Sequence, residues 1–302
     1  MNISVKKITE AEGHRAAIYT IARGFSDKEL LSAGSERFVA SWNLEHPEMA
    51  HVAAKTEGVI YSLQALPEQQ LLLAGTDSGN IHVMDVKNNQ EIKNIIAHSG
   101  GIFDLKTLQN NHLLVSSGSD GYLKIWSIPD FKLIYSLKLL EGKIRQIAIS
   151  PDAERIAAAC EDGKIRIIDA RNFTLLHEFH AHSMAVNALC FSPKGDVLLS
   201  GGKDAFLNVW NLIDYSLYKS IPAHNYAIYS IVFHPAGKWF ATGSRDKTIK
   251  LWNPDDYSFL IRIEKEIHGG HNNSVNKIYW SSFNNYLISA GDDRRIIVWE
   301  IE

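Results

Sequence analysis

One residue pattern recurs along the chain and constrains its fold more than any other feature. The pattern, seen most fully from Ser116 to Trp126, returns at 32–42, 200–210, 242–252 and 289–299. A histidine stands 28 positions before each tryptophan, and two weaker copies run over 56–84 and 140–168. The copies start at 14, 56, 98, 140, 182, 224 and 271, so five steps span 42 residues and the last spans 47. We predict seven copies of one structural unit in a single domain, 1–302.

Each unit has the hydrophobic period of strands. In the third copy, apolar residues alternate or cluster at 101–105, 112–116, 122–126 and 133–137, and Asp120-Gly121 suits a tight hairpin turn. A four-stranded unit cannot bury both of its faces alone, so neighbouring units must stack. The sequence therefore predicts an all-β fold of stacked four-stranded antiparallel units.

The two ends of the chain indicate how the array closes. About 13 residues usually separate a tryptophan position from the next start, and they carry the fourth strand. Only three residues follow Trp299, whereas 13 residues precede His14 and include the alternating segment Ile3-Ser4-Val5-Lys6. We expect residues 1–13 to supply the outer strand of the last unit and to close a ring without a free inner edge.

Composition excludes several classes of protein. The net charge of −3 gives no basic excess of the kind that nucleic-acid binders show, so we expect no nucleic acid as partner. No apolar run is long enough to span a bilayer, and the start lacks the apolar core of a signal peptide. We expect a cytoplasmic protein that does not bind membranes. Cys160 and Cys190 are expected as free buried thiols, with a disulfide as the alternative.

The residues that recur resemble those of the WD40 repeat family of β-propellers. The resemblance rests on a Gly/Ala-His pair, as in Ala97-His98, followed at fixed offsets by Ser or Thr, then Asp, then Trp. The family resemblance implies a seven-bladed propeller in which these four side chains form a buried hydrogen-bonded network. The implied sets are His98, Ser116, Asp120 and Trp126; His182, Ser200, Asp204 and Trp210; His224, Thr242, Asp246 and Trp252; and His271, Ser289, Asp293 and Trp299.

Three units depart from this set. The first has Glu36 at the Asp position, a longer carboxylate that we expect to fit less well. Units two and four lose the His, Ser and Trp together, as expected if a half-satisfied polar network is worse than an apolar core. Their replacements are Thr56, Ala74 and Met84 in unit two, and Leu140, Ala158 and Ile168 in unit four. The dipeptide Trp-Asp does not occur, but that Asp is not part of the network.

Nothing in the sequence indicates catalysis. The His and Asp residues repeat at equivalent positions, which is typical of a structural role, and neither a phosphate-binding loop nor a nucleophile elbow is present. His177, His180 and His182 have the look of a metal cluster, but His182 is already assigned to a network. We expect no catalytic residue, no metal ion and no cofactor.

A row of seven side chains is the first candidate for partner binding. Each stands five positions after its unit's start, where the resemblance implies a location at the mouth of the central channel. The row is Tyr19, Tyr61, Phe103, Arg145, Asn187, Tyr229 and Asn276. Its four aromatic rings could grip an inserted side chain, with cation–π attraction for Arg or Lys. The alternative is that the rings merely plug a narrow channel.

A second row precedes the network carboxylate and carries the charge of the same face. It comprises Ser35, Asp77, Ser119, Glu161, Lys203, Arg245 and Asp292. Lys203 and Arg245, with nearby Lys247 and Arg294, predict a basic sector over units five to seven, opposite Asp77 and Glu161. The five extra residues before His271 are expected to lengthen a loop on this face.

The sequence thus favours a non-catalytic interaction scaffold that binds a protein or peptide through the face bearing both rows, and that is monomeric by itself. This expectation rests on fold-level analogy and on the aromatic row. One rival is a fixed structural subunit of a larger complex that uses the outer blade edges. Another is a small-ligand binder or propeller enzyme with a pocket in the channel.

Overall fold

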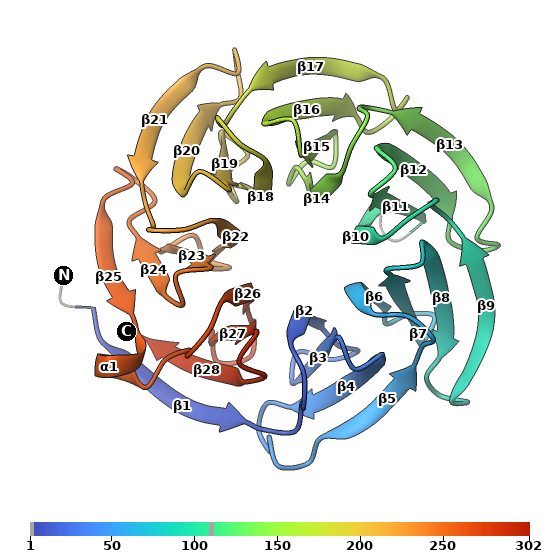
Figure 1. Ribbon diagram of the computed structural model, residues 1–302, viewed down its shortest axis with the longest axis horizontal. Coiled ribbons are helices and arrows are strands. Elements are labelled where there is room, and N and C mark those ends of the chain that lie inside the picture. Colours follow the sequence, from blue (N-terminus) through green and yellow to red (C-terminus); the bar gives the residue numbers. More distant parts are fainter. Residues whose placement is uncertain (1–2, 109–111) are drawn as a thin grey trace.

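The chain folds into a ring of seven antiparallel sheets around a central channel (Figure 1). The computed structural model describes residues 3–108 and 112–302; Met1 and Asn2, which belong to the expected closing segment, lie outside these ranges. Each sheet has four strands and is called a blade, numbered in the order of the repeat starts. The prediction of an all-β, seven-bladed propeller is confirmed.

The strands follow the chain from the channel outwards in blades 1 to 6, whereas the outermost strand of blade 7 is the N-terminal β1. Blade 1 contains β2 (Ile18–Arg23), β3 (Glu29–Gly34), β4 (Phe38–Asn43) and β5 (His51–Lys55). Blade 2 contains β6 (Ile60–Leu66), β7 (Leu71–Thr76), β8 (Asn80–Asp85) and β9 (Gln90–Ile96). Blade 3 contains β10 (Ile102–Leu108), β11 (Leu113–Gly118), β12 (Tyr122–Ser127) and β13 (Leu133–Lys138).

The remaining blades repeat this order. Blade 4 contains β14 (Ile144–Ile149), β15 (Arg155–Cys160), β16 (Lys164–Asp169) and β17 (Leu175–His180). Blade 5 contains β18 (Val186–Phe191), β19 (Val197–Gly202), β20 (Phe206–Asn211) and β21 (Leu217–Pro222). Blade 6 contains β22 (Ile228–Phe233), β23 (Phe240–Ser244), β24 (Ile249–Trp252) and β25 (Phe259–Ile263). Blade 7 contains β26 (Val275–Trp280), β27 (Leu287–Gly291), β28 (Ile296–Ile301) and β1 (Val5–Ala11).

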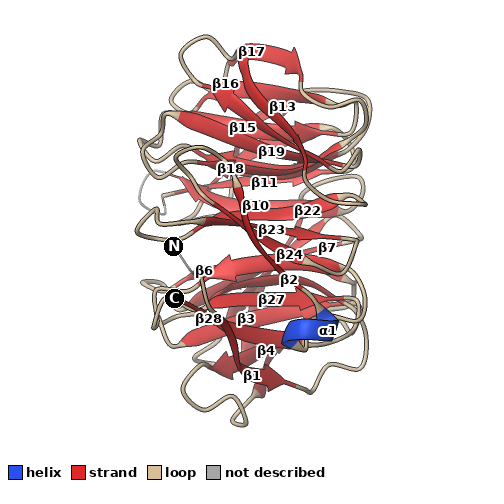
Figure 2. Cartoon of the chain, turned by 90° about the vertical axis from the view of Figure 1, so that its left-hand side faces the viewer, coloured by secondary structure: helices blue, strands red, loops and turns tan. Residues whose placement is uncertain are grey.

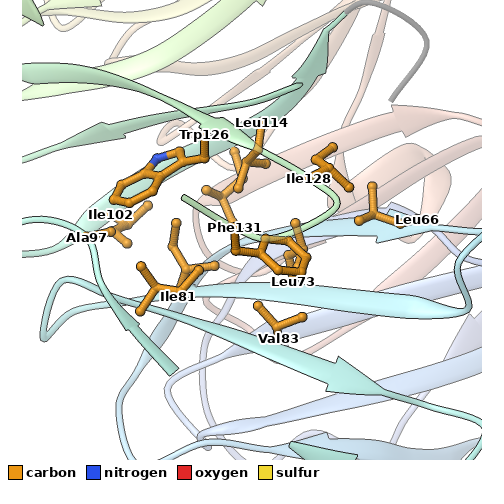
Figure 3. Packing of buried hydrophobic residues seen from close by; sticks show 12 residues of the cluster. Leu66, Leu73, Ile81, Val83, Ala97, Ile102, Leu114, Trp126, Ile128 and Phe131 are labelled. Carbon is orange, nitrogen blue, oxygen red and sulfur yellow. The ribbon is translucent and has the colours of Figure 1, made fainter. Parts of the chain in front are cut away.

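The hydrophobic core is divided among the contacts between neighbouring blades. Between blades 2 and 3, Phe131 of blade 3 lies beside Leu73 and Val83 of blade 2, and Trp126 lies at the other end of the same cluster (Figure 3). The two middle strands of a blade are almost fully buried, as the strands β7 and β11 illustrate. Because each blade is apolar on both faces, it needs a neighbour on each side, and only a closed ring provides this for all seven.

The N-terminal strand closes the ring. Strand β1 runs antiparallel to β28, with Val5 opposite Ile301 and Ala11 opposite Ile296. Beyond the strand ends, the backbone amides of Ser4 and Glu302 each donate to the other's carbonyl, at 2.8 and 3.1 Å. The expected donation of the outer strand by residues 1–13 agrees with this pairing for the described residues.

The short helix α1 (Lys265–His268) is the one helix among the described residues, and the sequence analysis did not predict it. It lies within the extra residues before blade 7, on the opposite side of the disc from the two chain ends (Figure 2). The loop expected there contains one helical turn, which is too short to show helical periodicity. Among the described residues, no helix combines the length and apolarity needed to cross a membrane.

We call the side of the disc that holds α1 the upper face. The turns between the second and third strands of each blade lie there, as do the connections from each outer strand to the next blade. The N- and C-terminal ends lie at the lower face (Figure 2).

Deleting residues 1–11 is expected to open the ring, because it exposes the outer edge of β28 and removes the partner of six residues in the ladder. The truncated protein should aggregate and lose its cooperative thermal transition by circular dichroism. A synthetic peptide of residues 1–13 added in trans should restore monomeric elution in size-exclusion chromatography. Unchanged unfolding of the truncated chain would contradict this role of β1.

Candidate functional site

A four-residue hydrogen-bonded network ties the upper turn of blade 3 to its core. His98 donates from Nδ1 to the Asp120 carboxylate at 2.8 Å and accepts at Nε2 from Ser116 Oγ at 2.8 Å. Trp126 Nε1 donates to the same hydroxyl oxygen at 2.9 Å. The carboxylate can only accept, so the proton must sit on Nδ1, which leaves Nε2 as the acceptor for the hydroxyl hydrogen. Every donor and acceptor of this buried set is thereby used.

The same geometry recurs in blades 5, 6 and 7. His–Asp distances are 2.9 Å in each, between His182 and Asp204, His224 and Asp246, and His271 and Asp293. His Nε2 to hydroxyl distances are 2.8, 2.7 and 2.8 Å, to Ser200, Thr242 and Ser289. The tryptophans Trp210, Trp252 and Trp299 each donate to that hydroxyl at 2.9 Å. The structure thus brings together all sixteen residues of the four sets named from the sequence.

Blade 1 forms the network with a glutamate, and the expectation of a poorer fit was wrong. His14 Nδ1 lies 2.8 Å from Glu36 Oε2, and Nε2 lies 2.7 Å from Ser32 Oγ, which also accepts from Trp42. The second carboxylate oxygen accepts from the Arg15 amide at 2.9 Å. The extra methylene is accommodated because the turn holds the residue close enough for both oxygens to find donors.

Blade 4 replaces the network with an ion pair elsewhere in the same turn. Asp162 no longer faces a histidine, and it accepts instead from both terminal nitrogens of Arg166, at 2.7 and 3.2 Å. Glu178 on β17 lies 3.0 Å from the same guanidinium, which is nearly buried. Leu140 and Ile168 pack in the apolar cluster between blades 3 and 4. The polar set is therefore exchanged as a whole, as the sequence predicted.

The suspected histidine cluster does not converge. Both ring nitrogens of His182 are engaged in its network, and His177 stacks on Tyr215 with ring centroids 4.7 Å apart. Within residues 3–108 and 112–302, no three His, Cys, Asp or Glu side chains gather closely enough to hold a metal ion. Cys160 and Cys190 are free thiols, and burial raises their pKa values to about 12 and about 11.

The seven side chains of the first candidate row line one pocket at the upper end of the channel. We call this pocket the channel mouth; its volume is about 390 Å³. Each blade contributes one member, at the start of its innermost strand. The seven are Tyr19, Tyr61, Phe103, Arg145, Asn187, Tyr229 and Asn276. A regular offset in the sequence thus becomes a closed circle of side chains around an open cavity.

The aromatic side of the channel mouth is a row of packed rings. The Tyr61 ring lies 5.5 Å from Tyr19 and 5.6 Å from Phe103, centroid to centroid, and its edge rests on the backbone of Gly101. Burial, followed by the Asp77 charge, raises the pKa of the Tyr61 hydroxyl. The rings support one another and do not fill the channel, since a cavity remains in front of them.

The other side of the channel mouth is polar. Arg145 pairs with Glu161 at 2.8 Å, but its buried Nε atom has no hydrogen-bond partner among the described residues. Asn276 donates to Asp292 at 2.7 Å and to the Ile18 carbonyl of blade 1 at 2.9 Å. Asn187 reaches the Ile228 carbonyl at 3.3 Å. The bonds to the Ile18 and Ile228 carbonyls cross from one blade to the next, and all of these contacts hold side chains that face the cavity.

Sequence reasoning missed the polar floor of the channel mouth. Asp104, Gln146 and Lys277 stand six positions after their unit's start and line both the mouth and a second cavity of about 470 Å³ below it. Asp104 accepts from the Ile147 amide at 2.9 Å, and Gln146 from the Leu189 amide at 2.7 Å. Burial lowers the pKa of Lys277, and Asp104 partly opposes this shift. Polar residues at one offset within otherwise buried strands were the signal available in the sequence.

The second candidate row lies around the channel mouth as charged and polar turns. Ser35 donates to the Tyr19 hydroxyl at 2.9 Å, and Asp77 accepts from the Val59 amide at 3.0 Å. Lys203 and Arg245 are exposed on blades 5 and 6, and Arg245 lies over the Tyr226 ring at 5.9 Å. The upper face is therefore acidic over blade 2 and basic over blades 5 to 7, whereas over blade 4 Glu161 is paired with Arg145 and Lys143.

The closed ring and its repeated His-Asp-Ser-Trp sets define the class of repeat β-propellers. A sequence model of the WD domain, G-beta repeat, matches residues 89–127, 132–169, 173–211, 215–253 and 264–300, more than half of the chain. The chain therefore belongs to the WD40 repeat family. Four of the five matches begin in the outer-strand region of one blade and end in or directly after the third strand of the next, so these four repeats straddle two blades. No curated protein matches the chain.

Replacing Ser116 with alanine is expected to lower the free energy of unfolding by about 1–3 kcal/mol, because the buried His98 and Trp126 nitrogens lose their shared partner. Ser117→Ala is the matched control: Ser117 is equally buried, but its hydroxyl has no hydrogen-bond partner among the described residues. That variant should stay within about 0.5 kcal/mol of the parent or gain stability. Urea denaturation compares the two, and equal losses would contradict the network.

Acid should destabilise the protein in two stages. Burial, opposed by hydrogen bonds to Glu36 and Asp246, lowers the pKa values of His14 and His224 below 6.5, so stability falls first as pH drops below that value. Burial tends to raise the pKa of Asp120, but the His98 hydrogen bond and charge outweigh it and lower the pKa from 3.8 to about 2. Stability from this carboxylate is present above 3.8 and is lost as pH falls towards about 2.

The Asp120→Asn variant isolates the second stage. Its urea midpoint should fall less steeply with pH than the parent's below about pH 4, because one depressed carboxyl no longer titrates. An acid limb as steep as the parent's would show that Asp120 does not contribute.

Proposed function

We propose that this protein is a non-catalytic interaction platform that binds a peptide segment of a partner protein at its upper face, with one partner side chain in the channel mouth. The observation that carries the proposal is the channel mouth itself. Seven blades each place one side chain around a cavity of about 390 Å³, with rings on one side and an arginine and amides on the other. Aromatic and arginine anchors at the centre of a concave surface are typical of protein-binding hot spots.

The composition of the channel mouth favours binding over catalysis. No histidine lines it, and its two carboxylates are held by hydrogen bonds. Asp104 accepts from the Leu105 and Ile147 amides, and Asp292 from the Asn276 amide group. The WD40 family membership supports the same proposal by analogy.

The proposal places a monomer in the cytoplasm. Two free thiols, one fully buried, are compatible with a reducing compartment. Binding through the upper face leaves the closed ring intact, so a second copy is not needed to complete the fold.

A specific observation favours a second candidate, attachment through the outer strands. Large apolar side chains are exposed at the same register of consecutive outer strands, as with Ile134 on β13, Leu176 on β17 and Tyr218 on β21. These side chains are 52%, 50% and 67% exposed, and a permanently bound partner subunit could cover this apolar surface.

Tyr61→Ala and Arg145→Glu are expected to weaken partner binding about tenfold or more, because each removes an anchor at the centre of the site. Parent and variants serve as baits for proteins of the native source, with captured proteins compared by quantitative mass spectrometry. Leu176→Lys and Tyr218→Lys form the matched set on the outer strands. Circular dichroism verifies that every variant is folded.

Loss of the same partner from both channel-mouth variants, but not from the outer-strand set, supports the proposal. Partners that survive both Tyr61→Ala and Arg145→Glu and disappear with the outer-strand substitutions would overturn it in favour of the second candidate.

A further inference from the structure

Six exposed basic side chains form a continuous series on the upper face, which we call the basic arc. They come from blades 5, 6, 7 and 1, and blade 1 adjoins blade 7 because the ring closes, with β2 packed beside β26 and β27. The six residues are Lys203, Arg245, Lys247, Arg294, Arg15 and Arg37. Ring closure thus extends the basic sector expected over blades 5 to 7 by two arginines from the other end of the chain.

No member of the basic arc forms a salt bridge with any residue in the described ranges. Three cations of blades 3 and 4 on the same face are paired: Lys143 and Arg145 both pair with Glu161, at 3.8 and 2.8 Å, and Lys138 pairs with Glu141 at 3.1 Å. The basic arc therefore presents positive charge that the protein itself does not neutralise by direct contact.

The backbone under the basic arc is a second feature that three of its members share, although blade 5 carries Ala205 at the same turn with φ of 70°. The residue after the network carboxylate position has a left-handed conformation in every blade, and blades 2, 3 and 4 use glycine there. Blades 6, 7 and 1 instead carry Lys247, Arg294 and Arg37, with φ of 74°, 69° and 62°. A side chain is disfavoured at such φ, whereas glycine is not. Disfavoured conformations kept at several equivalent turns are typical of functional surfaces.

Three carboxylates that directly precede members of the basic arc are not available to neutralise its charge at the surface. Asp246, Asp293 and Glu36 each stand directly before a member of the basic arc, but they are largely buried and bound to network histidines. Because these carboxylates are paired with histidines below the surface, the cations of the basic arc stay exposed above them. An incoming carboxylate can reach the cations but not the histidines.

The rest of the upper face decides which anion fits. Glu57 and Asp77 are exposed on blade 2. A long, uniformly negative polymer laid across the disc would meet these carboxylates and be repelled, whereas a short acidic stretch along the basic arc would not. The Tyr226 side chain, 59% exposed beside Arg245, offers apolar contact of a kind that a peptide can use.

We propose that the basic arc binds an acidic segment of the partner protein, rich in Asp or Glu, while adjoining residues of that segment enter the channel mouth. This inference rests on the proposed function and names the chemistry of its partner. The electrostatic contacts set orientation and speed of association, and the mouth supplies the central anchor.

The test is selection from a random-peptide phage library with the whole protein as bait, followed by affinity measurement of synthetic copies of the selected peptides. Three baits are compared at low and at high salt: the parent, Tyr61→Ala, and Arg245→Glu combined with Arg294→Glu. The control combines Lys87→Glu with Lys194→Glu, which make the same charge change at exposed turns of the lower face.

We expect selected peptides to be enriched in Asp and Glu, and to lose about tenfold or more in affinity with the Arg245/Arg294 variant and with high salt, but not with the control. Lys247→Gly and Arg294→Gly add a second readout. They should weaken peptide binding while thermal stability stays equal or rises, because glycine relieves the backbone at these turns.

Two outcomes separate this inference from the proposed function. Selected peptides that need Tyr61 but are not acidic, and bind the Arg245/Arg294 variant normally, overturn the acidic segment alone. If no peptide is selected, or if no selected peptide depends on the channel mouth or the basic arc, the proposed function is overturned as well. A single-stranded oligonucleotide that displaces the peptides more strongly than oligoglutamate would reassign the basic arc to nucleic acid.

Discussion

The pairing of β1 with β28 is the constraint on which the whole structure depends. Every blade is apolar on both faces, so each interblade cluster exists only while two blades stay in contact. The strand from the N-terminal end joins the last blade, and Arg295 of β28's hairpin forms an ion pair with Glu10 beside it. One antiparallel ladder thereby turns a stack of incomplete units into a body without an exposed inner edge.

Within that ring, the polar networks lock the upper turns to the core and leave the surface side chains free to differ. The five blades that carry a network use both nitrogens of its histidine, whereas the two without it replace the histidine, the hydroxyl residue and the tryptophan together. Replacing the three residues together avoids leaving a buried polar group without a hydrogen-bond partner, which would destabilise the fold. The turns are then held in one geometry whatever residue follows the carboxylate, which is why a glycine, an alanine or a lysine can occupy that place.

Periodicity explains why much of this could be predicted from sequence. Residues at one offset within the repeat, such as Tyr61 and Arg145, occupy equivalent positions around the ring. The residues that line the channel mouth can therefore be predicted from the sequence. Contacts between units could not be predicted, because a sequence does not say that Asp104 accepts from the next blade's Ile147 amide. The hydrogen bonds of Glu36 could not be predicted, because they depend on the detailed geometry of its turn. Helix α1 could not be predicted either, because its four residues are too few to show a helical period. Arg15 and Arg37 joined the basic sector only through closure.

The seam of the ring lies under the basic arc. Arg294 belongs to blade 7, which contains both ends of the chain, whereas Arg15 and Arg37 belong to the blade on the far side of the junction. A segment bound to all three arginines spans the junction between blades 7 and 1. It can contact all three only while these two blades are packed together as in the closed ring. Binding of the segment and closure of the ring are then thermodynamically linked. The bound segment stabilises the closed ring, and closure of the ring strengthens binding of the segment by the same free energy.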